Sequence, residues 1–196
     1  MRAKKNGRVV FRSGKKVDLV ILRKSDVEDL LRWFNDQEML NFLSGQEMKY
    51  ETDEEEWLAN LSKRRNTDQI FGVATKRGRL IGTAGLHGID RKNLTATGGI
   101  AIGEKSFWGK GYGSEAEMLL ASYAFLTLNL RKINAGVFSN NSRSLKAAIK
   151  GGAVEEGRRK KQFYVNGEYV DEIILAVFKE DWSPRWKKYF KQKQSK

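Results

Sequence analysis

The sequence predicts an α/β protein whose strands and helices follow the order βααβββαβαββ. Short apolar, β-branched runs of strand length alternate with longer runs that carry helix start signals. Two pairs of strand-like runs are separated by tight-turn dipeptides, Arg77-Gly78 and Asn166-Gly167. With 40% hydrophobic and 11% aromatic residues, a chain of 196 residues is long enough to bury one sizeable core.

The first three elements are a strand and two helices. Residues 17–22 are apolar and β-branched, as is typical of a strand. Ser25 and Thr52 are each followed three residues later by glutamate, a capping-box signal that predicts two helix starts. The stretch 44–51 between these helices is expected to be a loop.

The remaining elements follow from β-branched runs and from glycine and asparagine signals. Asn141 is a suitable N-cap for a short helix that Gly151-Gly152 would end. A longer helix is expected after the glycine-rich segment near residue 110, reaching about Leu130. Gly98-Gly99 inside a strand indicates a bulge or a close backbone approach. Six further strands are predicted over 70–75, 80–86, 95–102, 133–138, 161–165 and 169–178.

The net charge of +13 is concentrated at the two ends of the chain. Residues 1–16 carry seven basic side chains and residues 183–196 carry six, with no acid in either stretch, so residues 17–182 have no net charge. We therefore expect a basic N-terminal arm, a folded domain and a basic C-terminal tail. The basic ends would contact RNA or a ribosomal surface weakly, or remain solvated. Aromatic residues among the C-terminal lysines fit either an amphipathic helix or a base-stacking surface.

The composition excludes several kinds of site. The chain has no cysteine, which rules out disulfides, thiolate metal sites and a cysteine nucleophile, and His87 is its one histidine. No metal site is therefore expected. The apolar stretches are shorter than the roughly 20 residues that span a bilayer, and no signal segment is evident, so a cytoplasmic protein without a membrane partner is expected.

The segment Phe107–Ala116 carries glycine at positions 109, 111 and 113, between a predicted strand and a predicted helix. Such a loop lets backbone N–H groups approach a ligand, and a helix N-terminus adds partial positive charge, so the segment suits a phosphate. It departs from a P-loop because it reads Gly-Lys-Gly, and from a dinucleotide fingerprint because Ser114 takes the place of the last glycine. A glycine-rich turn without a ligand is the alternative.

The same segment, followed by Asn141-x-x-Ser144 and Lys150-x-Gly152, resembles the acetyl-CoA-binding motif of the GNAT N-acetyltransferases. Within them it is most similar to the branch of ribosomal-protein N-terminal and spermidine acetyltransferases. The resemblance covers residues from about 17 to 182. It implies the GNAT fold, a mixed and mostly antiparallel central sheet flanked by helices, with acetyl-CoA as co-substrate.

The resemblance also implies cofactor contacts. The strand before the loop and the strand after its helix would splay apart around the pantetheine arm, while loop amides hold the pyrophosphate. Lys110 or Arg143 would meet a CoA phosphate. The implied cofactor-binding residues are Ile100, Ala101, Ile102, Trp108, Gly109, Lys110, Gly111, Tyr112, Gly113, Ser114, Asn141 and Ser144.

The catalytic positions depart from the family pattern. Ala148 stands where many relatives have a tyrosine acid, and Thr97 where many have a glutamate base, while Trp108 replaces the motif's Gln or Arg. His87 and Glu104 are the candidate bases, because one has a pKa suited to neutral pH and the other follows the cofactor strand. Tyr164 as acid, or a water relay, are the alternatives.

The resemblance implies that an acetyl group is transferred from acetyl-CoA to a primary amine, which attacks the thioester directly. The amine would belong to a protein N-terminus, a polyamine or another small molecule. Acidic residues at Glu47, Glu51 and 53–56 would attract a cationic acceptor, or form a solvated helix start. The alternative function is a catalytically weak or inactive CoA-binding protein that docks on RNA or a ribosome through its basic ends. A homodimer is a further open alternative.

Overall fold

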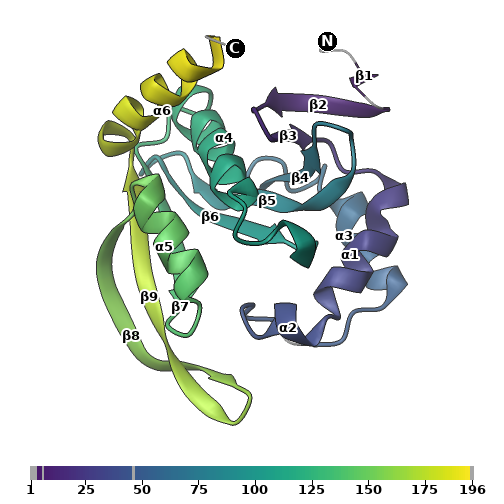
Figure 1. Cartoon of the computed structure of the whole chain (residues 1–196). Coiled ribbons are helices and arrows are strands. Elements are labelled where there is room, and N and C mark those ends of the chain that lie inside the picture. Colours follow the sequence, from purple (N-terminus) through teal and green to yellow (C-terminus); the bar gives the residue numbers. More distant parts are fainter. Residues whose placement is uncertain (1–3, 6, 46, 195–196) are drawn as a thin grey trace.

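The computed structural model describes residues 4–5, 7–45 and 47–194, and in that part of the chain a nine-stranded sheet runs in the order β1-β2-β3-β4-β5-β6-β7-β9-β8 (Figure 1). Neighbouring strands are antiparallel except for the parallel pair β6–β7. The expected mixed, mostly antiparallel sheet is thus confirmed. The strands are β1 Lys4–Lys5, β2 Arg8–Ser13, β3 Val17–Val20, β4 Gln69–Thr75, β5 Leu80–Asp90, β6 Thr95–Ile102, β7 Lys132–Phe138, β8 Val154–Val165 and β9 Glu168–Phe178.

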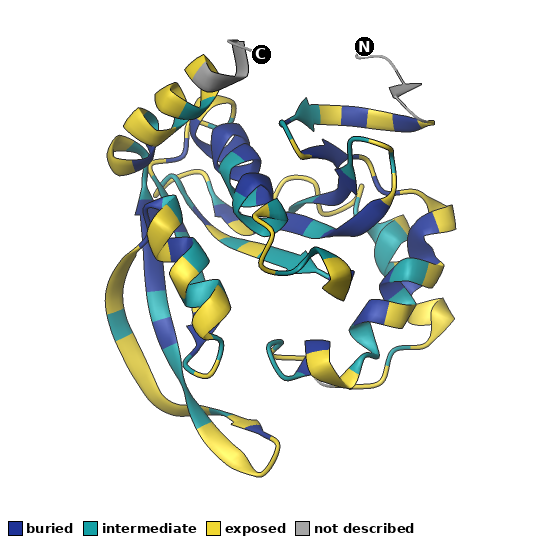
Figure 2. Ribbon diagram, viewed as in Figure 1, coloured by how far each residue is buried: buried dark blue, intermediate teal, exposed yellow. Residues whose placement is uncertain are grey.

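Helices flank the sheet and enclose two apolar clusters. The larger cluster surrounds α4, which contacts the sheet as well as α5 and α6, so nearly every side of this helix is buried (Figure 2). The smaller cluster joins α1 and α3 to strands β3–β5 through Leu30 and Trp33. The helices are α1 Val27–Phe34, α2 Gln37–Leu40, α3 Glu51–Asn60, α4 Tyr112–Leu126, α5 Ser142–Gly151 and α6 Lys179–Gln194, with short 3-10 turns η1 Lys24–Asp26 and η2 Lys105–Phe107.

The expected N-terminal arm is largely part of the sheet. Strand β2 pairs antiparallel with β3, and Val10 is buried against Leu22 and Leu30 in the smaller cluster. The Arg8 guanidinium donates to both oxygens of Asp26 at 3.0 and 2.7 Å, and both side chains are buried. From Arg8 onward this segment therefore belongs to the folded body rather than to an arm; residues 1–3 and 6 lie outside the described residues.

The expected basic tail forms most of helix α6. Trp182 is 1% exposed, stacks on Trp186 at 5.3 Å and packs in the larger cluster, while Phe190 at the far end is 44% exposed. Of the two expectations for these aromatic residues, the structure thus has the amphipathic helix, and it packs on the body beside α4. Residues 195–196 lie outside the described residues.

Helix starts are shifted from the predicted caps. The Asp26 carboxylate accepts the Arg23 amide at 2.9 Å, and the Asp53 carboxylate accepts the Tyr50 amide at 2.8 Å. The turn η1 and the helix α3 therefore each begin about two residues before the capping boxes suggest, and α1 itself begins only at Val27, after η1. By contrast, Asn141 caps α5 as predicted. The Asn166-Gly167 turn also joins β8 and β9 as predicted, because both residues have positive φ, 50° and 90°.

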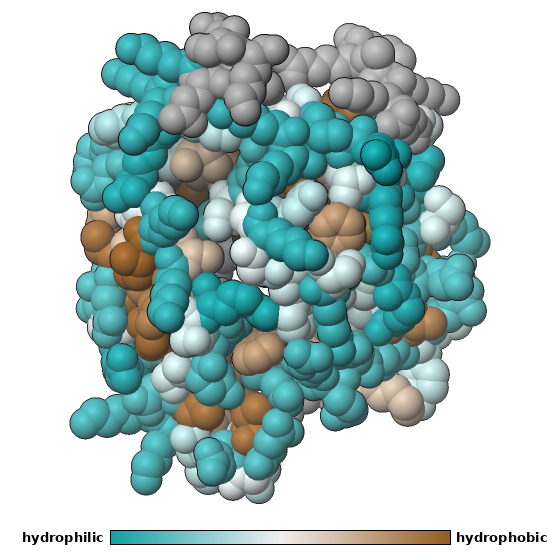
Figure 3. All heavy atoms as spheres, viewed as in Figure 1, coloured by the Kyte–Doolittle hydropathy of each residue, from teal (hydrophilic) through white to brown (hydrophobic). Residues whose placement is uncertain are grey.

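Most of the surface in Figure 3 is hydrophilic, and its apolar residues lie in separate small patches. Among the described residues, no helix combines the length and the apolar character needed to cross a membrane.

Candidate functional site

The parallel strands β6 and β7 separate after a short pairing. Their register runs only from Thr95 with Lys132 to Thr97 with Asn134, although both strands continue beyond it. Strand β6 stays paired with β5 as far as Ile102, so its other edge diverges from β7 between Gly98 and Ile102. The backbone groups on that edge can therefore pair with an extended ligand inserted between the strands.

The glycine segment follows directly and turns into α4. Gly109 and Gly111 have φ of 69° and 81°, the left-handed region that glycine enters without steric cost. Gly111 is the N-cap of α4, so the amides of Tyr112, Gly113 and Ser114 have no intrahelical acceptor and carry the positive end of the helix dipole. No side chain caps this end of α4, because the glycine itself takes the cap position.

The expected pyrophosphate loop and the expected pantetheine edge thus meet at one place. A Cβ built on Gly113 would lie 3.5 Å from Ile102, the last residue of β6. Strand β6 supplies Ile100, Ala101 and Ile102, and the loop supplies the segment from Trp108 to Ser114. These residues fit acetyl-CoA, because an open strand edge and a convergent set of amides match an amide-rich arm joined to a diphosphate.

Asn141 and Ser144 are brought beside α4 by helix α5, but they contact each other. The Asn141 carboxamide oxygen accepts the Ser144 amide at 3.0 Å. Their first role is therefore to start α5, and a cofactor contact would use the remaining amide and hydroxyl groups.

Trp108 connects the glycine loop to the end of β6 and to Arg143. Its indole N–H donates to the Ile102 carbonyl at 2.5 Å, and the Arg143 guanidinium lies 3.8 Å from the centre of its ring. Arg143 also lies 5.6 Å from the ring of Phe42, just beyond α2. The aromatic residue that replaces the motif's Gln or Arg therefore fixes an arginine next to the loop.

Glu104 is poorly suited to act as a base. Its carboxylate is buried and accepts hydrogen bonds from Arg32, from the Trp33 indole at 3.2 Å and from Arg79 at 2.5 Å. Burial alone would raise the pKa of this carboxyl, but hydrogen bonds from Arg32 and Trp33 and the charges of Arg32 and Arg79 hold it below its usual value. The arrangement favours a structural role, tying α1 to the end of β6.

His87 lies at the better position. It pairs in register with Thr97 on β6, and its Nε2 atom lies 3.1 Å from where a Cβ on Gly85 would be. Gly99, which pairs with Gly85, has open space on its Cβ side. The Nδ1 atom faces the Asp68 carboxylate at 3.8 Å. The imidazole thus lies with Nε2 near Gly85, on the same face of the sheet as Gly99 of β6.

The other catalytic alternatives are less well placed. Tyr164 lies on the exposed β8–β9 hairpin, where its ring is tilted against that of Tyr169 with the ring centres 5.1 Å apart. Ala148, which stands where the resemblance implies a tyrosine, is buried in the larger cluster and has no group that could act as an acid.

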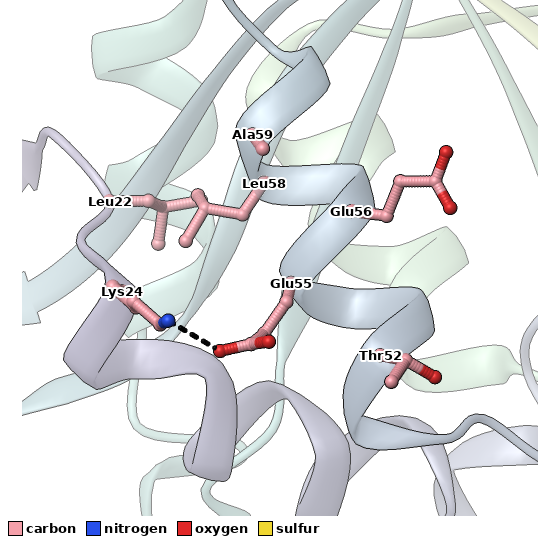
Figure 4. A pocket seen from close by; sticks show the side chains of 7 residues that line it. All are labelled: Leu22, Lys24, Thr52, Glu55, Glu56, Leu58 and Ala59. Atoms are coloured by element: carbon pink, nitrogen blue, oxygen red, sulfur yellow. Dashed lines mark ion pairs between the residues drawn. The ribbon is translucent and has the colours of Figure 1, made fainter.

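The acidic residues proposed to attract an acceptor are divided by the fold. Glu55 pairs with Lys24 at 2.9 Å, and both line an open hollow of about 600 Å³ between η1 and α3 (Figure 4). Glu54 is buried, and burial raises the pKa of its carboxyl. None of the residues that line this hollow belongs to the glycine loop or to β6 and β7, so it is separate from the expected cofactor site.

Two contacts at the loop are not signalled by the sequence. The Lys16 ammonium donates to the Lys110 carbonyl at 2.8 Å, and Glu115 in the first turn of α4 accepts three backbone amides from residues 15–17. Lys16 lies within the basic run that suggested a solvated arm, and Glu115 reads as an ordinary acid at a helix start. Only the tertiary fold brings them together.

Known proteins agree with this arrangement. Residues 16–154 match the family model described as an acetyltransferase (GNAT) domain. The chain is 27% identical to the uncharacterized N-acetyltransferase p20 of Bacillus licheniformis, over 83% of the chain and 94% of that protein. It is 32% identical to a spermidine N(1)-acetyltransferase of Vibrio cholerae, over 64% of the chain and 72% of that protein.

Solved structures show the same fold. A spermidine N-acetyltransferase from Vibrio cholerae, in complex with CoA and spermine, superposes with a TM-score of 0.79 at 24% identity, covering 86% of this chain and 98% of that one. A ribosomal-protein-S5-alanine acetyltransferase from Vibrio fischeri gives 0.77 at 24% identity, covering 89% and 98%. The family match, which spans well over half of the chain, and the site geometry lead to one conclusion: this chain belongs to the GNAT acetyltransferase family.

Proposed function

We propose that the protein transfers the acetyl group of acetyl-CoA to a primary amine by direct attack. The observation that carries the proposal is the meeting of the free β6 edge at Ile102 with the glycine loop at Gly113, two residues after the left-handed Gly111. Similarity to spermidine N-acetyltransferases supports an amine acceptor, and the choice between a polyamine and a protein N-terminus stays open.

The residues would share the work as follows. The edge of β6 from Ile100 to Ile102 binds and aligns the pantetheine arm, and the amides from Gly109 to Ser114 neutralise the pyrophosphate. Bound acetyl-CoA supplies an activated thioester that a neutral amine attacks, so no covalent intermediate with the protein is needed. Asn141 and Ser144 bound the site on the side of α5.

His87 is the proposed general base. An amine must lose a proton before or during attack, because only a free lone pair is nucleophilic. The Nε2 atom over Gly85 faces open space beside Gly99, and Asp68 lies on the opposite side of the ring. Glu104 is not proposed, because Arg32 and Arg79 occupy its carboxylate.

The alternative of an inactive protein that docks on RNA rests on two free basic ends. Strand β2 pairs with β3, and α6 packs on the body through Trp182 and Trp186, so much of both basic segments belongs to the fold and this alternative is the less favoured one.

The test is turnover. Purified protein receives acetyl-CoA and, in separate reactions, spermidine, spermine, small monoamines and peptides with free N-termini, and release of the CoA thiol is followed. We expect thiol release that depends on at least one amine. Thiol release that no amine accelerates, together with acetyl-CoA binding, would leave the alternative of an inactive CoA-binding protein.

A further inference from the structure

The Lys16 ammonium is held at the glycine loop. Its Nζ atom donates to the Lys110 carbonyl at 2.8 Å, and a Cβ built on Gly111 would lie 3.4 Å from it. It also lies 5.7 Å from the centre of the Tyr112 ring. A full positive charge therefore lies beside three of the loop residues whose backbone is proposed to hold the pyrophosphate.

The position of Lys16 is set by Glu115. The buried Glu115 carboxylate accepts the amides of Lys15, Lys16 and Val17 at 3.0, 2.6 and 2.8 Å. Charge-assisted hydrogen bonds of this kind are among the stronger ones in proteins. Glu115 lies in the first turn of α4, the helix that follows the loop. Its hydrogen bonds therefore hold the backbone of Lys16 against the start of this helix.

Helix α6 completes this arrangement. The Tyr189 hydroxyl donates to Glu115 Oε1 at 2.9 Å and accepts the Lys15 amide at 3.1 Å. Burial, followed by the charge of Glu115 and the hydrogen bond to it, raises the pKa of the Tyr189 phenol. The hydroxyl thus stays protonated and keeps donating to Glu115. The segment at Lys15 and helix α6 therefore meet at the N-terminus of α4.

We propose that Lys16 is a cofactor-binding residue that contacts a phosphate of acetyl-CoA, with Glu115 and Tyr189 as its positioning residues. This inference rests on the proposed function. An ammonium has three donors, and the bond to Lys110 uses one of them. Loop amides offer partial charges, whereas Lys16 adds a whole charge beside them and offsets the carboxylate of Glu115, which would otherwise oppose a diphosphate.

The first experiment removes the charge of Lys16. Lys16→Met keeps most of the aliphatic stem, Lys16→Arg keeps the charge, and Lys187→Met removes an exposed lysine of α6. Acetyl-CoA affinity is measured by calorimetry, and KM is measured for acetyl-CoA and for S-acetylpantetheine, which has the thioester but no phosphate. Thermal melting checks that each variant folds.

We expect Lys16→Met to weaken acetyl-CoA binding about 10-fold, the scale of one charge-assisted hydrogen bond, and to leave KM for S-acetylpantetheine unchanged. Its affinity falls less with added salt than that of the wild type. Lys16→Arg and Lys187→Met stay within about 3-fold of the wild type. An unchanged affinity in folded Lys16→Met, or equal losses for both acetyl donors, would overturn the inference while leaving the proposed function standing. A wild-type protein that does not bind acetyl-CoA overturns both.

The second experiment tests the positioning role. Tyr189→Phe keeps the ring and removes only the hydroxyl on Glu115. We expect a loss of about 3-fold in acetyl-CoA affinity that disappears in the Lys16→Met background, because Tyr189 acts through Lys16. A loss of the same size in both backgrounds would show that Tyr189 does not position Lys16.

Discussion

His87 on β5 pairs with Thr97 on β6, the last residue of β6 that also pairs with β7. The imidazole therefore lies where the sheet begins to open, on the side where Gly99 leaves space. Thr97 stands where the family resemblance implies a glutamate base, and its cross-strand neighbour His87 is the base that we propose instead.

Replacing His87 by Gln removes that base and keeps a side chain of similar size. We expect kcat to fall about 100-fold and KM for acetyl-CoA to stay within about 2-fold, because His87 is not part of the cofactor loop. Thr97→Ala is the matched control and should keep kcat. Steady-state kinetics across pH 6–9 measure both, and a His87→Gln variant with wild-type kcat would place the base elsewhere.

Glu104→Gln should lower stability and leave catalysis intact. The change removes the negative charge between Arg32 and Arg79, which should lower the free energy of unfolding by about 1–3 kcal/mol. Because the folded pKa of Glu104 is lowered, its stabilising contribution is present above the unfolded value of 4.5 and is lost as the pH falls through the folded value. Urea unfolding at pH 7 and pH 4 measures this difference, with the exposed Glu28→Gln as control. A large loss of kcat in folded Glu104→Gln would restore it as a catalytic candidate.

Glu117 makes stability fall as the pH rises. Burial raises the pKa of its carboxyl from 4.5 to about 7. Between these values the unfolded chain loses the proton and the folded protein keeps it, so the free energy of unfolding decreases from pH 4.5 to pH 7 and stays lower above. We expect Glu117→Gln to raise the Tm by a few degrees at pH 8 and to have little effect at pH 4.5. Exposed Glu180→Gln is the control, and an equal effect at both pH values would contradict this account.

Helix α6 should be part of the folding unit. Trp182 is 1% exposed and lies 5.2 Å from Phe125 of α4, whereas Phe190 is 44% exposed. We expect Trp182→Ala to lower the free energy of unfolding by about 3–5 kcal/mol and Phe190→Ala to lower it by less than about 1 kcal/mol. Denaturant unfolding compares them, and similar small losses would mean that α6 is a loosely attached tail.

Much of the fold could be predicted from short-range signals. The Asn166-Gly167 hairpin could be predicted because asparagine and glycine adopt positive φ at little steric cost. The Asn141 cap could be predicted because its side chain can accept a backbone amide at a helix start. The starts of α1 and α3 were harder to predict, because several neighbouring polar residues could form the cap. In the structure the carboxylates of Asp26 and Asp53 accept the backbone amides there. Helix α2 is only one turn long and lacks a periodic apolar pattern.

The basic ends show where charge counting fails. Arg8 is buried because Asp26 pairs with it, and the lysines of α6 surround aromatic residues that the body covers. A sum of charges does not reveal such partners, which are distant in sequence. The same limit hides the contact of Lys16 with the loop, since residues 16 and 110 are joined only by the tertiary fold.

Acetyl-CoA binding to Gly111→Glu, measured by calorimetry against wild type, tests the central claim most directly. Glutamate is strained at a φ of 81° and places a negative charge at the proposed pyrophosphate site, while Gly167→Glu imposes similar strain, at 90°, in the remote β8–β9 turn. We predict that wild type and Gly167→Glu bind acetyl-CoA and that folded Gly111→Glu does not. Equal acetyl-CoA affinity in all three, or no binding by the wild type, would contradict the assignment of this loop to the cofactor.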